Sequence, residues 1–179
     1  MPFTFTPCPI PGLFEIQPKV FGDNRGYFFE CYSERDFSAA GITLPFVQDN
    51  QSCSIKGSLR GLHFQKSRPQ GKLVRAIQGE VFDVAVDIRA GSPTAGKWHA
   101  VALSEEKQNQ FYISPGFAHG FLALSDQVVF AYKCTDFYYP EDEGGIIWDD
   151  PDIAIKWPDI GVGYTLSEKD KQLPYFIKK

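Results

Sequence analysis

The sequence predicts an all-β fold with the short antiparallel strands of a sandwich or jelly roll. Aromatic residues make up 15% of the chain, with sixteen Phe and eight Tyr, and these residue types favour strands over helices. Thirteen Pro and sixteen Gly supply the many turns that short strands require. A length of 179 residues suits one compact domain, and no internal repeat, low-complexity tract or linker divides it. We therefore expect a single domain over residues 1–179.

The clearest strand is the alternating segment from Val81 to Ile88. One of its faces is wholly apolar and is expected to be core: Phe82, Val84, Val86 and Ile88. The opposite face carries the carboxylates Asp83 and Asp87, which must meet polar groups or solvent. This pattern suits a barrel or sandwich with a polar cavity. Further strands are expected at Lys72–Ala76, His99–Leu103, Gln110–Ile113, Gly120–Leu124 and Val128–Cys134.

Only two short helices are predicted. Ser33–Ala40 begins with a Ser N-cap and stops at Gly41. Ser167–Leu173 begins with the spacing of a capping box and ends at Pro174. Turns are expected at 114–116 and 139–141, where Pro and Gly interrupt the pattern.

Composition and charge narrow the function classes. The net charge is −4 and the pI is about 5.4, which argues against binding to a nucleic-acid backbone. The N-terminus has no basic segment followed by an apolar one, and no stretch approaches 18 apolar residues, so neither a signal peptide nor a membrane span is expected. The four cysteines lie far apart and form no CxxC pair, which is typical of reduced thiols. We expect a cytoplasmic protein that binds neither nucleic acid nor membrane.

The three histidines are His63, His99 and His119, and a jelly roll with a polar mouth first suggests a metal site. No His-x-His pair is present, and each histidine lies in a different segment. A metal-dependent cupin is therefore kept only as an alternative, and no metal or cofactor is expected.

The stretch from Gln48 to Gln65 is unusually polar for a buried strand. It reads either as a functional surface or as a solvated edge hairpin that turns at Lys56-Gly57. Gly61, between Arg60 and His63, suggests that another group approaches the backbone closely. His119 lies between glycines and phenylalanines in SPGFAHGF, where a packed histidine in a tight turn is the simplest interpretation.

Taken in order along the chain, these segments resemble the dTDP-4-dehydrorhamnose 3,5-epimerase family of cupin-type sugar epimerases. Nine motifs, spread over residues 17–174, carry the resemblance: Phe21-Gly22-Asp23-x-Arg25-Gly26 with Phe28-Phe29-Glu30, Gln48-Asp49-Asn50, Leu59-Arg60-Gly61-Leu62-His63, Gly71-Lys72-Leu73-Val74-Arg75, Val84–Arg89 with Ser92-Pro93-Thr94, Pro115–Phe121, Tyr132-Lys133, Trp148 with Asp150-Pro151, and Leu166-Ser167-x-Lys169-Asp170. Each motif is weak alone, and the nine in this order are specific.

The resemblance implies inversion of C3 and C5 in a dTDP-linked 4-keto-6-deoxyhexose, in the biosynthesis of dTDP-L-rhamnose. His63 would be the base, since an imidazole titrates near neutral pH, and Asp170 would orient it. Tyr132 would be the acid on the opposite face, and Lys72 would stabilise the enolate oxygen. The substrate's own ketone is the electron sink, so the reaction needs no cofactor.

Simpler roles compete at these positions. Asp170 also fits a helix cap, Tyr132 a core aromatic residue and Lys72 a surface lysine. Asp83 or Asp87 is a second candidate for orienting His63 or His119.

The resemblance also implies a set of substrate-binding residues. Arg25, Arg60 and Lys169 would oppose the diphosphate, and Tyr138 would stack on thymine, although Phe137 and Tyr139 flank it. The complete set is Phe21, Arg25, Glu30, Gln48, Asp49, Asn50, Arg60, Lys72, His119, Tyr138, Glu143 and Lys169.

For the fold, the resemblance implies a double-stranded β-helix with a few short peripheral helices. It further implies a homodimer, with residues near Phe21–Glu30 completing the partner's active site. The alternatives are a single-carbon deoxysugar epimerase of a secondary-metabolite pathway, a metal-dependent cupin and a non-catalytic sugar-nucleotide binding domain. The intact Tyr132 favours inversion at both carbons. The preference between thymine and uracil, and the downstream pathway, stay open.

Overall fold

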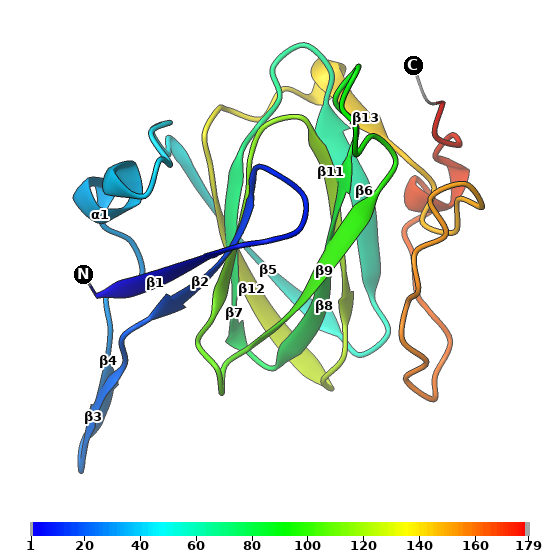
Figure 1. Ribbon diagram of the computed structural model, residues 1–179. Coiled ribbons are helices and arrows are strands. Elements are labelled where there is room, and N and C mark those ends of the chain that lie inside the picture. Colours follow the sequence, from blue (N-terminus) through cyan, green and yellow to red (C-terminus); the bar gives the residue numbers. More distant parts are fainter. Residues whose placement is uncertain (1, 178–179) are drawn as a thin grey trace.

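Two antiparallel sheets face each other in the computed structural model, which describes residues 2–177 (Figure 1). The six-stranded sheet has the order β1 (Phe3–Pro7), β2 (Leu13–Pro18), β10 (Gln110–Ile113), β7 (Lys72–Gln78), β12 (Gln127–Cys134) and β5 (Gln48–Ile55). The five-stranded sheet has the order β13 (Glu143–Gly145), β6 (Leu59–Gln65), β11 (Phe117–Ala123), β8 (Glu80–Asp87) and β9 (Trp98–Ser104). This all-β, cupin-like jelly roll confirms the predicted fold class.

The predicted strands are present, and one of them begins three residues earlier than expected. The strand predicted from Gly120 starts at Phe117, so His119 lies inside β11 and not in a tight turn. Glycine is needed at position 120 of this strand, because a Cβ there would lie 2.6 Å from the carbonyl oxygen of Arg60. The predicted turn at 114–116 directly precedes the strand.

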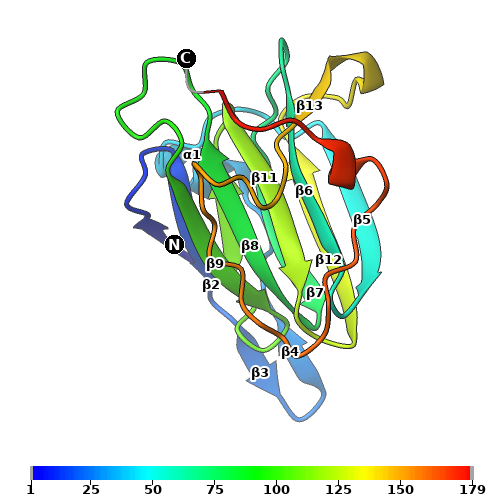
Figure 2. The same cartoon turned by 90° about the vertical axis from the view of Figure 1, so that its right-hand side faces the viewer.

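Both faces of β8 are buried, and the carboxylate face is the one that points into the barrel. Val81 and Ala85 join the interior cluster with Phe111 and Phe130. The apolar face lies on the outside of the sheet, where residues 146–157 and Phe176 cover it (Figure 2). The prediction that this face is core is confirmed, and the layer that covers it is supplied by the C-terminal segment and not by the opposite sheet.

Only one of the two predicted helices forms as an α-helix. Helix α1 spans Glu34–Ala39, and the side chain of Ser33 caps it as predicted. The second is reduced to the 3-10 turn η2 (Asp170–Gln172), and the chain is already extended at Leu173. Pro174 disfavours helical geometry in the residue before it, which limits the segment to this turn. Another 3-10 turn, η1, spans Pro140–Asp142.

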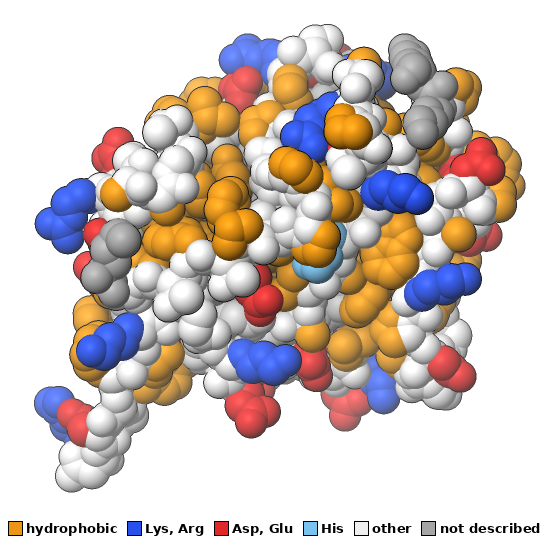
Figure 3. Space-filling model, viewed as in Figure 1, with side chains coloured by type: hydrophobic (Ala, Val, Ile, Leu, Met, Phe, Trp, Pro, Cys, Tyr) orange, Lys and Arg blue, Asp and Glu red, His pale blue; other side chains and the backbone are white. Residues whose placement is uncertain are grey.

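A small hairpin of β3 (Phe21–Asp23) and β4 (Gly26–Phe28) extends away from the barrel, at the lower left of Figure 1. Its aromatic side chains are largely exposed, with Tyr27 at 62% and Phe28 at 67%. The space-filling view shows charged groups of both signs near its end (Figure 3). Along the described part of the chain, no helix has the length and apolar character needed to cross a membrane.

Candidate active site

A bulge in β6 brings Arg60 and His63 to the same side of the sheet. His63 pairs with His119 of β11, whereas Arg60 pairs with Phe121, so two residues of β6 stand opposite the single residue Gly120. Side chains three apart on a regular strand would point to opposite faces. The extra residue corrects this phase, and both Arg60 and His63 line the interior cavity.

Gly61 is the residue that makes the bulge possible. Its φ is +123°, and a Cβ there would lie 2.6 Å from Gly120 Cα and 2.7 Å from the carbonyl oxygen of His119. The close approach predicted at Gly61 is therefore confirmed, and the approaching group is the neighbouring strand β11. The edge-hairpin interpretation was wrong, because β5 and β6 join different sheets on either side of the turn at Lys56-Gly57.

The interior of the barrel holds a cavity of about 510 Å³ between the two sheets. An adjoining hollow of about 250 Å³ shares His63, Lys72 and Tyr132 with it. Of the residues expected to act on the substrate, the cavity is lined by Arg60, His63, Lys72, His119, Tyr132, Lys169 and Asp170, and the hollow adds Gln48, Asn50, Tyr138 and Glu143. Residues from both sheets and from the C-terminal segment thus meet around one space.

His63 and Asp170 form a direct pair, with 2.7 Å between Nε2 and Oδ1. The other oxygen of Asp170 accepts the backbone N–H of Gly61 at 3.4 Å, and Ser167 Oγ accepts the backbone N–H of Asp170. Burial of the Asp170 carboxyl opposes its ionisation, but its hydrogen bonds to His63, Gly61 and Ser167 outweigh burial and hold its pKa below the ordinary value. The capping bond from Ser167 is present, while the carboxylate itself faces His63.

His119 and Asp83 form a second pair, which is fully enclosed by protein. His119 Nε2 lies 3.0 Å and 2.9 Å from the two oxygens of Asp83. Burial lowers the pKa of His119, only partly opposed by the Asp83 carboxylate, so the ring is neutral. Each aspartate therefore orients a different histidine: Asp170 lies against His63, and Asp83 lies against His119. Asp87 instead bonds Arg89, Ser92 and Thr94.

Lys72, at the start of β7, and Tyr132, in β12, line both parts of the cavity. Burial lowers the pKa of Lys72, although Cys134, Asp83 and Glu143 oppose this effect. Burial likewise raises the pKa of Tyr132, so its phenol is protonated at neutral pH. The ring of Tyr132 also packs against the interior core, so the core and functional interpretations of this residue are compatible.

Ordered polar groups surround the mouth of the cavity. Glu143 accepts hydrogen bonds from Tyr138 Oη, at 2.7 Å, and from Lys169 Nζ. Burial opposes ionisation of Glu143, but these two bonds outweigh it and lower its pKa. Arg60 donates to Ser54 Oγ at 3.0 Å, and this bond holds the guanidinium beside the cavity.

Four expected binding residues lie outside the cavity of their own chain. Phe21 and Arg25 belong to the projecting hairpin, where Arg25 forms an ion pair with Asp23, and Glu30 is exposed just beyond it. Asp49 points to the opposite face of β5, where Lys133 Nζ donates to it at 2.9 Å.

The predicted set of site residues leaves out several cavity-lining residues, including Phe130 and also Ser52, which lies within the polar stretch Gln48–Gln65. Both were accessible to a simple pattern argument. Ser52 follows Asn50 by two positions on β5, and Phe130 precedes Tyr132 by two on β12, so each shares a face with a residue already assigned to the site.

Each of the three histidines contacts a different partner. His63 and His119 each face one carboxylate, and His99 lies on β9 with its ring 6.1 Å from that of Phe111. Between residues 2 and 177, no three His, Cys, Asp or Glu side chains converge as the ligands of a metal would.

Residues 7–178 match the dTDP-4-dehydrorhamnose 3,5-epimerase family. The chain is 54% identical to the dTDP-4-dehydrorhamnose 3,5-epimerase of Pseudomonas aeruginosa over 164 residues, which is 91% of this chain and 90% of that protein. It superposes with a TM-score of 0.94 and 51% identity on dTDP-6-deoxy-D-glucose-3,5-epimerase RmlC from Legionella pneumophila, a structure in complex with dTDP-4-keto-L-rhamnose, covering 97% of this chain and 92% of the other. ChmJ, a 3'-monoepimerase from Streptomyces bikiniensis solved with dTDP-quinovose, is more distant, with 34% identity, a TM-score of 0.89 and coverage of 94% and 86%. The chain belongs to the dTDP-4-dehydrorhamnose 3,5-epimerase family of isomerases.

Proposed function

We propose that this enzyme inverts C3 and C5 of dTDP-4-dehydro-6-deoxy-D-glucose to give dTDP-4-dehydro-L-rhamnose, in dTDP-L-rhamnose biosynthesis. The observation that carries the proposal is the His63–Asp170 pair, which opens into the same cavity as Lys72 and Tyr132. Both carbons flank the C4 ketone, so loss of either proton gives an enolate whose charge rests on O4. The reaction therefore requires a base, an acid on the opposite face and a cation near O4.

His63 is the proposed base. Because Asp170 is a carboxylate, it accepts the Nε2–H of a neutral imidazole and leaves the lone pair on Nδ1 free to take the substrate proton. The C–H electron pair moves into the enolate, and His63 becomes an imidazolium. The buried negative charge of Asp170 stabilises that cation, as the carboxylate does in a catalytic triad.

Lys72 and Tyr132 are the proposed partners of the enolate. The Lys72 ammonium is partly desolvated, which strengthens its electrostatic effect on a developing charge at O4. Its lowered pKa also makes it a stronger hydrogen-bond donor. Tyr132 then donates its phenolic proton to the carbon from the face opposite His63, and this completes the inversion. The His63 proton and the missing Tyr132 proton are exchanged with solvent before the next cycle.

Arg60 and Lys169 are the proposed diphosphate ligands within the chain, and Tyr138 is the proposed stacking partner of thymine. Gln48, Asn50, His119 and Glu143 supply polar groups to the same space, in the cavity and its adjoining hollow.

A homodimer would bring the remaining residues to a site. We propose that the β3–β4 hairpin reaches the partner's cavity and presents Phe21, Arg25 and Glu30 there. The exposed aromatic rings of the hairpin and its projection from the barrel support this (Figure 1). Asp49 would then contact substrate from the outer face of β5. The cytoplasmic location stays a prediction from the sequence.

Solvent deuterium exchange tests the reaction directly. The enzyme is incubated with dTDP-4-keto-6-deoxyglucose in D2O, and the labelled carbons are located by NMR. We expect label at both C3 and C5, whereas label at C3 alone would replace the proposal by single-carbon epimerisation. No label, in protein that binds dTDP, would refute both.

Variants and a metal assay complete the experiment. His63→Ala should abolish exchange and keep dTDP binding, while the matched control His99→Ala, on the far strand β9, should keep both. Stoichiometric zinc, iron or nickel with chelator-sensitive activity would instead establish the metal-dependent alternative.

A further inference from the structure

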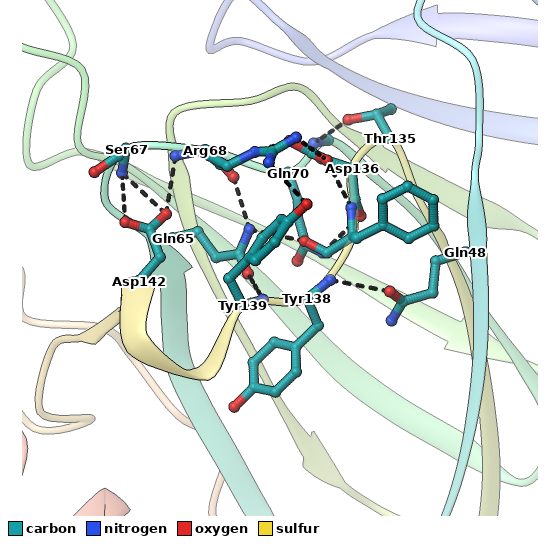
Figure 4. A network of polar contacts seen from close by, with 12 residues as sticks. Gln48, Gln65, Ser67, Arg68, Gln70, Thr135, Asp136, Tyr138, Tyr139 and Asp142 are labelled. Atoms are coloured by element: carbon teal, nitrogen blue, oxygen red, sulfur yellow. Dashed lines mark hydrogen bonds and ion pairs between the residues drawn. The ribbon is translucent and has the colours of Figure 1, made fainter.

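Two loops at the mouth of the cavity are joined by an extensive polar network (Figure 4). One loop connects β6 to β7 over residues 66–71, and the other connects β12 to β13 over residues 135–142. The second loop carries three consecutive aromatic residues, Phe137, Tyr138 and Tyr139, and their order alone does not decide which of them faces a ligand. The network decides this point.

Gln65 lies at the centre of the network, as the last residue of β6, and is only 5% exposed. Its Nε2 donates to the carbonyl oxygens of Arg68, at 2.7 Å, and Phe137, at 3.1 Å. Its Oε1 accepts the backbone N–H of Tyr139 at 2.7 Å. One buried amide therefore satisfies three backbone groups in two loops, and the position of each loop depends on it.

The side chain of Tyr139 is engaged from two directions. Arg68 donates to Tyr139 Oη at 2.7 Å, and its guanidinium lies 4.3 Å from the centre of the ring. Asp136 anchors the same guanidinium through two bonds of 3.0 Å and 3.1 Å. Tyr139 is thus a structural part of the network, and one face of its ring is covered.

Tyr138 points the other way. Gln48 Oε1 accepts its backbone N–H at 3.0 Å, while its ring is directed away from the network (Figure 4). Tyr138 is 49% exposed and borders the hollow beside the cavity, where its hydroxyl donates to Glu143. Because Tyr139 has an extended backbone and adjacent residues of an extended chain alternate in direction, holding the Tyr139 side chain against Arg68 directs the Tyr138 side chain toward the ligand space.

We propose that Gln65 is a positioning residue for nucleotide binding, which holds Tyr138 as the preformed stacking surface for the base. This inference rests on the proposed function. A rigid aromatic ring binds a base without first losing loop entropy, so the contribution of Gln65 belongs to binding and not to proton transfer. Removing an aromatic stacking partner weakens binding by roughly 5- to 150-fold, and releasing the loop should cost about tenfold.

The test compares Gln65→Leu and Gln65→Asn with the matched control Gln78→Leu. Gln78 is an exposed residue of β7 whose side chain, within residues 2–177, donates only to Gln127. Gln65→Asn keeps a neutral amide on a side chain one methylene shorter, which cannot reach all three backbone groups, so it provides a milder variant if Gln65→Leu does not fold. The measurements are the Kd of dTDP, the Kd of inorganic pyrophosphate, and kcat and KM.

For both Gln65 variants we expect the Kd of dTDP and KM to rise about tenfold, with the pyrophosphate Kd unchanged and kcat within about twofold of the original enzyme. In a Tyr138→Ala background, the Gln65 substitutions should cause no further loss of dTDP affinity, because the ring they position is gone.

Unchanged dTDP affinity in the Gln65 variants would overturn the inference, as would a loss of equal size in the Tyr138→Ala background. An equal loss of pyrophosphate and dTDP affinity would also overturn it, since that indicates general damage to the site. If the original enzyme neither binds dTDP nor exchanges deuterium, the proposed function itself fails.

Discussion

Replacement of Asp170 by Asn separates the role of its negative charge from its role in packing. The two side chains have nearly the same size, and an amide oxygen can still accept a hydrogen bond from His63 Nε2. The amide can also turn its NH2 toward His63, which then favours the tautomer whose lone pair points away from the substrate. The change thus removes the charge that stabilises the imidazolium and the control over the tautomer.

The size of the effect follows from the geometry. The bond is short, at 2.7 Å, and the Asp170 side chain is only 6% exposed, so solvent screens it little. A hydrogen bond to a charged group contributes about 1.5–3 kcal/mol, and about 1.4 kcal/mol changes a rate tenfold. We expect kcat to fall by roughly 10- to 150-fold, and the comparable substitution in a serine-protease triad sets an upper limit of about 10⁴-fold.

The assay is the rate of solvent deuterium uptake at saturating substrate, measured by NMR together with the Kd of dTDP. The nucleotide affinity should stay unchanged, because the loss concerns the base alone. Asp150→Asn is the matched control. Asp150 is another buried carboxylate of the C-terminal segment, and it accepts backbone N–H groups of Asp152, Ile153 and Phe176, so its loss should lower stability and not exchange.

The dependence of stability on pH gives a second readout. The folded-state pKa of Asp170 is lowered, so its contribution to stability is fully present above the unfolded value of about 3.9 and is lost as the pH falls through the folded value. The stability difference between the original protein and Asp170→Asn should therefore shrink below about pH 4. A deuterium uptake rate within about threefold of the original would refute the proposed role of Asp170.

Three further predictions concern the bulge, the second histidine and the dimer. Gly61→Ala should lower the free energy of unfolding by about 3 kcal/mol and Tm by about 10 °C, because of left-handed backbone strain and overlap with the neighbouring strand. The control Gly91→Ala should cost only about 1 kcal/mol, since Gly91 has a φ of +72° but a Cβ there would meet no atom within 4 Å. Equal losses for the two variants in calorimetry would contradict this prediction. NMR of 15N-labelled histidine should show His119 neutral at pH 7 with its proton on Nε2, and a proton on Nδ1 would show that its aspartate partner is protonated instead. An equal mixture of Arg25→Ala and His63→Ala chains, refolded together, should regain about a quarter of the original activity if Arg25 acts across the dimer, because about half of the dimers are mixed and each mixed dimer has one intact site. No recovery would show that Arg25 does not act in the partner's site.

Local patterns were sufficient for the fold class and for most of the chemistry-bearing residues. Residue patterning located the six predicted strands, β7 to β12, because each of them buries apolar side chains. The order of the motifs led to His63, Lys72 and Tyr132, and the structure brings these three residues to one cavity. The helix expected at Ser167–Leu173 is reduced to one 3-10 turn, because Pro174 favours the extended conformation of Leu173 over a further helical turn.

The sequence by itself determined that the chain is a β-rich jelly roll and which side chains are chemically able to move a proton. The resemblance named Asp170 as the partner of His63, and only the tertiary structure decided between Asp170 and Asp83. His63 and Asp170 are 107 residues apart, and only the docking of the C-terminal segment onto β6 brings them within 2.7 Å. The bulge at Gly61 decided that Arg60 and His63 share a face, although strict alternation places them on opposite faces. Both outcomes depend on contacts between segments, which the local spacing of residues does not encode.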